Sequence, residues 1–164
     1  PLHTGGWNNT FNFYGVDLSI FFNWSYGNNI LNANRLMFEY YDGSQLNQFG
    51  TMRNAYSVER NPQSDIPRAG ARGMEYYSSR VVEDGSFLRL KTLTLGYTIP
   101  DKLLKKVKIS SLRVYLTGDN LFTITNYSGP DPEVSTRNSV LTPGFDWSAY
   151  PRARTITGGI SLTF

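Results

Sequence analysis

The sequence has no cysteine, which excludes disulfides, cysteine-based metal sites and thiol catalysis. It has one histidine, His3, and no G-x-S-x-G motif, so a Ser-His-Asp triad would depend on that single side chain. Charged residues make up only 18% of the chain, and no run of about eighteen apolar residues predicts a transmembrane helix. We therefore expect a protein that is not an enzyme, has no cofactor and does not cross a membrane as a helix.

The formal net charge is +3, and the basic residues are spread along the chain except for one cluster of lysines. The cluster comprises Lys102, Lys105, Lys106 and Lys108. It could bind anionic lipid or a partner, but a short charged run of this kind more often forms a solvated turn. No recognised nucleic-acid-binding module is present, so we expect no nucleic acid partner.

Aromatic residues are abundant, at 15% of the chain, and many of them follow an alternating pattern. Residues 16–26 place apolar side chains at every second position, and Phe21 is the one apolar residue on the opposite face. Such period-two alternation predicts a β-strand. A tilted strand of about 9–11 residues is long enough to cross a bilayer.

The same alternation predicts four further strands. They lie at about 7–14, 86–99, 110–124 and 152–164. Large aliphatic side chains opposite small hydroxyl groups suit a wall with lipid outside and a polar interior, so we predict an all-β, antiparallel transmembrane β-barrel. The predicted lipid-facing residues are Leu18, Ile20, Phe22, Leu93, Leu95, Leu112, Val114, Leu116, Ile156, Ile160 and Leu162.

Two cations interrupt this pattern, because Arg89 and Lys91 share a face with Leu93 if the alternation is continuous. Either a β-bulge switches the register between them and Leu93, or both side chains lie beyond the hydrocarbon. In the first case they line the interior of the barrel. In the second they are placed to pair with lipopolysaccharide phosphates at the outer rim.

The connections between the predicted strands alternate in length. The turn at Gly15 and the link at 100–109 are short, whereas 27–85 and 125–151 are long. Short periplasmic turns and long extracellular loops are typical of outer-membrane barrels. We therefore expect 27–85 and 125–151 to be extracellular and 100–109 to be periplasmic, with a short helix at 30–41.

Several stretches resemble one family. Residues 86–134, SFLRLKTLTLGYTIPDKLLKKVKISSLRVYLTGDNLFTITNYSGPDPEV, resemble the C-terminal hallmark of SusC-like TonB-dependent transporters from Bacteroidota. Residues 150–164, YPRARTITGGISLTF, resemble that family's last strand, and residues 5–28, GGWNNTFNFYGVDLSIFFNWSYGN, fit the strand pair before a long loop. DIPRAG followed by SSRVVEDGSFLRLK matches the approach to the hallmark, so the resemblance covers most of the chain and is weakest at 30–56.

The resemblance implies a 22-stranded barrel in a Gram-negative outer membrane, with this chain supplying its last five strands. It also implies active import of large nutrients, oligosaccharides or peptides. A SusD-like surface lipoprotein would act as the lid, and TonB-ExbB-ExbD would supply energy through an N-terminal part. The chain begins at Pro1, without an initiator methionine, so we expect it to be a piece of a longer protein.

Candidate functional residues lie at the end of the chain and in the last loop. Phe164, with Leu162 and Ile160 before it, resembles the signal read by the barrel-assembly machinery; the alternative is an edge strand that merely ends in Phe. Three loop aromatics could contact a ligand or a lid, although each could also pack within the loops. They are Tyr127, Trp147 and Tyr150.

Two other functions and a metal site remain as alternatives. A soluble carbohydrate-binding β-sandwich would bury its apolar faces and needs frequent turns, which the insertion at 27–85 opposes. A passive outer-membrane porin would differ only in parts that lie outside this sequence. The acidic residues Asp131, Glu133 and Asp146 could hold Ca²⁺, but their spacing matches no calcium loop, so no metal is predicted.

Overall fold

The computed structural model describes residues 1–39, 46–70, 77–104, 109–135 and 143–164. The chain divides into two compact units. We call Pro1–Gly27, Ser86–Asn126 and Arg152–Phe164 the sheet unit, and Asn28–Gly85 with Tyr127–Pro151 the loop unit. Lys105, Lys106 and Lys108 of the predicted lysine cluster lie outside the described residues.

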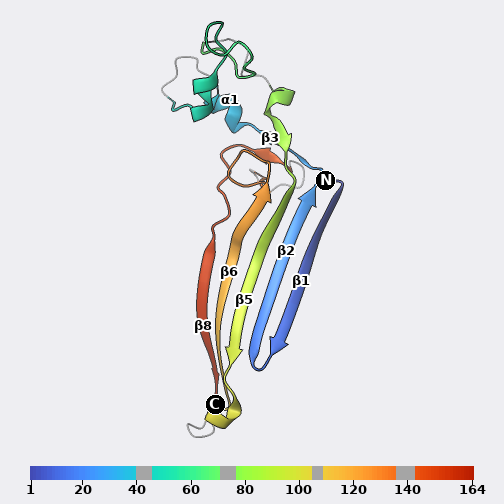
Figure 1. The fold of residues 1–164 in the computed structure, drawn as a ribbon, viewed down its shortest axis with the longest axis vertical. Helices are drawn as coiled ribbons and strands as arrows, with labels where there is room; N and C mark the ends of the chain where they lie inside the picture. Colours follow the sequence, from blue (N-terminus) through green and yellow to red (C-terminus); the bar gives the residue numbers. More distant parts are fainter. Residues whose placement is uncertain (40–45, 71–76, 105–108, 136–142) are drawn as a thin grey trace. The chain divides into compact units, whose positions relative to one another are not determined.

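The sheet unit is one antiparallel sheet of five long strands in the order β1-β2-β5-β6-β8, which lie side by side in Figure 1. The strands are β1 (His3–Phe13), β2 (Val16–Tyr26), β5 (Phe87–Thr98), β6 (Ser111–Thr125) and β8 (Thr155–Thr163). Each pairs with its neighbour in sequence order along the sheet, which is the arrangement of a barrel wall.

The register between the strands gathers the apolar side chains on one face. Leu18 of β2 pairs with Leu95 of β5, which pairs with Leu116 of β6, and Val114 of β6 pairs with Ile160 of β8. This face is largely uncovered, because Leu95 is 50% exposed, Leu116 54% and Ile160 68%. A β-sandwich would bury such a face against a second sheet, so the geometry disagrees with the sandwich alternative.

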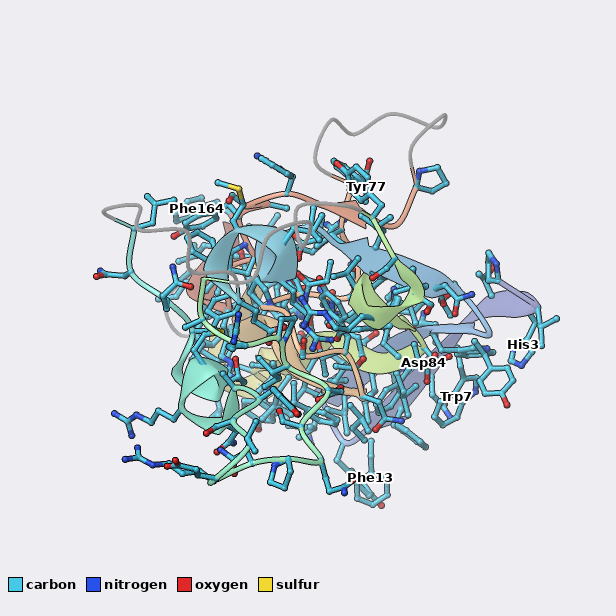
Figure 2. The ribbon with its side chains drawn as sticks, turned by 90° about the horizontal axis from the view of Figure 1, so that it is seen from above. His3, Trp7, Phe13, Tyr77, Asp84 and Phe164 are labelled. Carbon is cyan, nitrogen blue, oxygen red and sulfur yellow. The ribbon has the colours of Figure 1, made fainter. Side chains whose placement is uncertain are left out.

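Large aromatic side chains mark the edge strand β1 and its turn. Trp7 is 53% exposed and Phe13 72%, and Figure 2 shows both side chains, with His3, at the periphery of the ribbon. The turn from β1 to β2 is tight because Tyr14 and Gly15 both have positive φ angles, of 46° and 85°. Two consecutive positive φ angles suit the twist of a two-residue hairpin.

A β-bulge in β5 decides the face on which Arg89 lies. Leu90 pairs with Phe22 and Thr92 pairs with Phe21, so Lys91 is skipped in the ladder with β2. The bulge shifts the alternation by one residue, as one of the two predicted alternatives requires. Arg89 pairs with Asn23 and therefore lies on the polar face, where it is only 3% exposed.

A short helix lies at the same end of the sheet unit as the turn from β1 to β2, since Thr98 N at the end of β5 bonds to Gly15 O at 2.7 Å. The helix α2 (Asp101–Leu104) follows β5, and its Leu104 is only 4% exposed. Among the described residues no helix is long and apolar enough to span a membrane. The edge strands β1 and β8 each pair with one neighbour in the described sheet, so each leaves a row of backbone groups available for further pairing.

The loop unit is a folded body built from both long connections. It contains a three-stranded sheet, β4-β3-β7, in which Leu31 of β3 pairs with Phe145 of β7 across more than a hundred residues of sequence. Its core is formed by Ile30, Tyr127 and Val134, with Ala149 packed against them. Its elements are β3 (Asn29–Asn32), α1 (Asn34–Phe38), η1 (Gly50–Asn54), η2 (Ser79–Val81), β4 (Val82–Asp84) and β7 (Phe145–Asp146).

The predicted helix at 30–41 is only partly right. Its first residues form β3, and the helix is confined to α1. Ile30 is fully buried and Asn32 is 2% exposed, and this alternation across β3 is maintained by pairing on both of its edges. The β-ladder with β4 and β7 therefore overrides the weak local preference for helix.

Candidate functional site in the loop unit

A cluster of four charged side chains lies at the centre of the loop unit. Arg35 and Glu39 are one helical turn apart on α1, and Arg35 Nε donates to Glu39 Oε2 at 2.9 Å. Arg80 Nη1 donates to the same carboxylate oxygen at 2.6 Å, and Thr51 Oγ1 donates to Glu39 Oε1 at 3.0 Å. Glu39 is only 3% exposed, so these partners replace the water that its carboxylate loses on burial.

The second carboxylate of the cluster, Glu83 on β4, joins the two connections. Its oxygens accept hydrogen bonds from Ser128 N and Ser128 Oγ, both at 2.8 Å, and from Asn32 Nδ2 at 3.1 Å. Arg35 Nη1 lies 3.3 Å from Glu83 Oε1. Burial alone would raise the pKa of Glu83, but the hydrogen bonds from Ser128 and Asn32 and the charge of Arg35 outweigh it and hold that pKa below its ordinary value.

A buried pair of side chains forms a second link within the loop unit. Tyr127 donates a hydrogen bond of 2.5 Å from its hydroxyl to Asp146 Oδ2, and Asp146 is 0% exposed. The other oxygen of Asp146 accepts a bond from Ala149 N at 3.2 Å. Burial, together with the bond to Asp146, raises the pKa of Tyr127 above its ordinary range, so the phenol stays protonated.

Next to the charged cluster is a cavity of about 900 Å³. Its lining includes the carboxylates Glu39 and Glu83 and the exposed residues Phe49, Thr51 and Ser148. We call the exposed part of the lining its mouth. Its size lies within the range of roughly 300–1,000 Å³ that small-molecule sites occupy. The loop unit therefore offers a concave site with polar groups, charges and aromatic rings on its walls.

The structure separates the three predicted loop aromatics. Tyr127 is 6% exposed and belongs to the core, with its ring and hydroxyl both occupied within the loop unit, which favours the packing alternative for this residue. Trp147 is 41% exposed and stacks on Phe145 with ring centroids 6.5 Å apart, and Tyr150 is 92% exposed. Trp147 and Tyr150 stay predictions as contacts.

The predicted assembly residues lie at the end of the sheet unit. Ile160 and Leu162 are on the apolar face of β8, paired with Val114 and Leu112, and Phe164 follows the strand with 88% exposure. Their role in assembly stays a prediction. Among the described residues no group of three or more His, Asp or Glu side chains is placed to hold a metal ion.

Sequence reasoning missed the charged cluster of the loop unit. Only Arg35 and Glu39 carry a local signal, because a spacing of four residues places them on one face of a helix. Arg80 and Glu83 join them across more than forty residues, through the pairing of β4 with β3. No periodic pattern in the sequence predicts such a contact.

On the polar face of the sheet unit, an ion pair crosses one strand. Arg113 of β6 donates from Nε to Asp17 Oδ1 at 2.9 Å and from Nη2 to Asp17 Oδ2 at 2.5 Å. The pair passes over Gly96 of β5, where a Cβ atom would lie within 2.5 Å of both partners. Glycine at position 96 therefore leaves the space that this cross-strand pair needs.

Known proteins with similar sequences are receptors of one kind. TonB-dependent receptor P3 of Formosa agariphila is 38% identical over 169 residues, covering 100% of this chain and 16% of the relative. TonB-dependent receptor SusC of Bacteroides thetaiotaomicron is 38% identical over 114 residues, covering 68% of this chain and 10% of the relative. Comparison with protein-family models gives no match.

Solved structures show the same likeness. The RagAB peptide transporter matches with a TM-score of 0.82 and 32% identity over 98% of this chain and 17% of the matched chain. The sheet and these matches define the class of protein, because the five antiparallel strands are a segment of a TonB-dependent β-barrel. The chain belongs to the SusC-like TonB-dependent receptors, which confirms the resemblance found in the sequence. It spans between a tenth and about a sixth of the length of the relatives it matches.

Proposed function

We propose that this chain forms part of the wall and extracellular surface of an outer-membrane importer for large nutrients, oligosaccharides or peptides. The observation that supports it most strongly is the TM-score of 0.82 at 32% identity with the RagAB peptide transporter. The chain supplies the last five strands of a barrel of about 22 strands. Its apolar face contacts lipid, and its polar face lines the interior.

The orientation follows from the connections. The loop unit holds the two long connections, 28–85 and 127–151, and these connections are extracellular. The link at 100–109 is periplasmic. Phe164 and the strand before it are read by the barrel-assembly machinery, and β8 pairs with the first strand of the barrel, because an unpaired edge in lipid leaves backbone groups unsatisfied.

Two partners complete the importer. A SusD-like surface lipoprotein covers the extracellular side, where the exposed Trp147 and Tyr150 are available for contact. TonB-ExbB-ExbD drives uptake through a part of the receptor that lies outside this chain.

Uptake in the native host tests this function. A strain without the receptor gene should take up oligosaccharides or peptides more slowly than the same strain carrying the full-length receptor. An uncoupler of the proton gradient should abolish the difference, whereas a passive pore would keep it. Equal uptake with and without the receptor would show that the proposed function is wrong.

A further inference from the structure

The cavity of the loop unit is built around charges that are already paired. Two guanidinium groups, Arg35 and Arg80, face two carboxylates, Glu39 and Glu83, at 2.6–3.3 Å. All four side chains are at most 18% exposed. A charged ligand would have to displace one of these partners and leave another charge buried and unpaired, which is costly.

Hydrogen-bonding capacity remains available in the same cavity. Asn34 Oδ1 accepts bonds from Ser148 N at 2.6 Å and Ser148 Oγ at 3.3 Å, while its Nδ2 has no hydrogen-bond partner among the described residues. Among the carboxylate oxygens, Glu39 Oε1 accepts one bond, from Thr51 Oγ1, and Glu83 Oε2 accepts one, from Ser128 N, so each of these two oxygens keeps an acceptor site. A ligand hydroxyl both donates and accepts, so it can bond to these groups without disturbing the ion pairs.

The mouth of the cavity is aromatic. Phe49 is 40% exposed and lies beside Phe38, with ring centroids 5.2 Å apart and planes inclined at 46°. Aromatic side chains supply a large apolar surface at small entropic cost. Such a surface suits the C–H face of a sugar ring, while the hydroxyl groups at the ring edge reach the polar walls.

The polar face of the sheet unit offers similar chemistry. Its cross-strand contacts include the paired charges Asp17 and Arg113 and the hydroxyl pair Thr94 and Thr117, whose oxygens are 3.0 Å apart. In both units the polar contacts join hydroxyls, amides and oppositely charged groups. A peptide with free termini carries two charges of its own at neutral pH and gains less from such surfaces.

We propose that the cavity lined by Phe49, Asn34 and the Arg35–Glu39–Glu83 cluster is a binding subsite for a neutral sugar residue of an oligosaccharide. The proposal rests on the proposed import function and narrows its substrate class. The sugar ring lies against Phe49, and its hydroxyl groups bond to Asn34 and to the carboxylates.

Variants at two positions of the mouth test the subsite in the full-length receptor, expressed in a receptor-deletion strain of the native host. Phe49→Ala removes the aromatic surface. Gly50→Trp fills the mouth, and a Cβ atom at Gly50 meets no atom within 4 Å, so the backbone tolerates the change. Tyr56→Ala is the matched control, because Tyr56 is 39% exposed in the same connection and does not line the cavity.

Two probe mixtures are offered to each strain, and mass spectrometry follows the depletion of each component. One is a pool of neutral oligosaccharides from partially hydrolysed glucans, fructans, mannans, xylans and galactans; the other is a tryptic digest of casein. Rates are divided by folded receptor per cell. We expect receptor-dependent depletion of oligosaccharides that is roughly tenfold slower at low concentration for Phe49→Ala and Gly50→Trp, a change equivalent to about 1.4 kcal/mol, with Tyr56→Ala at the wild-type rate.

Three results overturn the inference in distinguishable ways. Receptor-dependent depletion of peptides but not of sugars leaves the import function standing and shows that the substrate class is wrong. Receptor-dependent depletion of sugars that neither mouth variant slows relative to Tyr56→Ala shows that the cavity is not a subsite. If the wild-type receptor depletes neither mixture, the proposed import function is itself wrong.

Discussion

A lysine on the apolar face of β8 should disrupt the barrel far more than a lysine on its polar face. Gly159 is the middle residue of β8 (Thr155–Thr163), and Ile160 follows it. If the middle of β8 is placed at the centre of the bilayer, a rise of about 3.3 Å per residue and a tilt of roughly 40° put Ile160 about 2.5 Å from that centre. Lysine there should cost about 2–4 kcal/mol, the range for a cation at the midplane of the lipid face.

A matched change on the polar face controls for the loss of strand propensity. Ser161 is adjacent to Ile160 but pairs with Arg113, so a lysine there would add repulsion between like charges. Thr157 is the better control, since it pairs with the uncharged Thr117.

The assay is the amount of folded full-length receptor in the outer membrane, measured by heat-modifiable gel mobility. A cost of 2–4 kcal/mol lowers the ratio of folded to unfolded receptor by roughly 30- to 1,000-fold at equilibrium, so Ile160→Lys should be strongly depleted. Thr157→Lys should remain close to wild type. Depletion of Thr157→Lys with normal levels of Ile160→Lys would refute the assignment of the two faces.

Three further predictions concern the chain end and the loop unit. Deleting Phe164 should lower folded receptor in the outer membrane while leaving uptake per folded molecule unchanged; normal abundance with lost uptake would place it in the transport path. Tyr127→Phe removes the bond to buried Asp146 and should destabilise the loop unit by about 1–3 kcal/mol, seen as faster amide hydrogen exchange there; unchanged exchange would contradict this. The pKa of Glu83 is lowered in the fold, so its contribution to stability is present above about pH 4.5, its unfolded value, and is lost as pH falls through the folded pKa. Amide exchange of the loop unit, divided by the intrinsic rate at each pH, should therefore rise in that range for wild type but not for Glu83→Gln. An equal rise in both proteins would exclude Glu83 as the cause.

The sheet was predictable because its signal is local. Alternation across 16–26 and 152–164 gives each residue a face, and the same alternation governs the register with the neighbouring strand. The bulge at Lys91 was predictable only as one of two alternatives. A bulge forms between two paired strands, and the sequence of one strand does not say which other strand it pairs with.

The loop unit was not predictable because its contacts are distant in sequence. Leu31 pairs with Phe145, and Glu83 binds Ser128, yet neither pair lies in a periodic segment. The role of Tyr127 stayed between two alternatives for a related reason. Tyrosine suits both an exposed contact and a core position, and the buried partner that decides between them, Asp146, is recognised only when the chain is folded.

Cysteine accessibility tests the central claim, that the sheet crosses the outer membrane with the loop unit outside. Tyr150 is 92% exposed in the loop unit, and Leu103 is 66% exposed in the link at 100–109, so burial within the chain blocks neither position. In a full-length receptor without other cysteines and in cells without the partner lipoprotein, an impermeant maleimide should label Tyr150→Cys in intact cells. It should label Leu103→Cys only after the outer membrane is opened. Labelling of Leu103→Cys in intact cells, with or without protection of Tyr150→Cys, would contradict the claim.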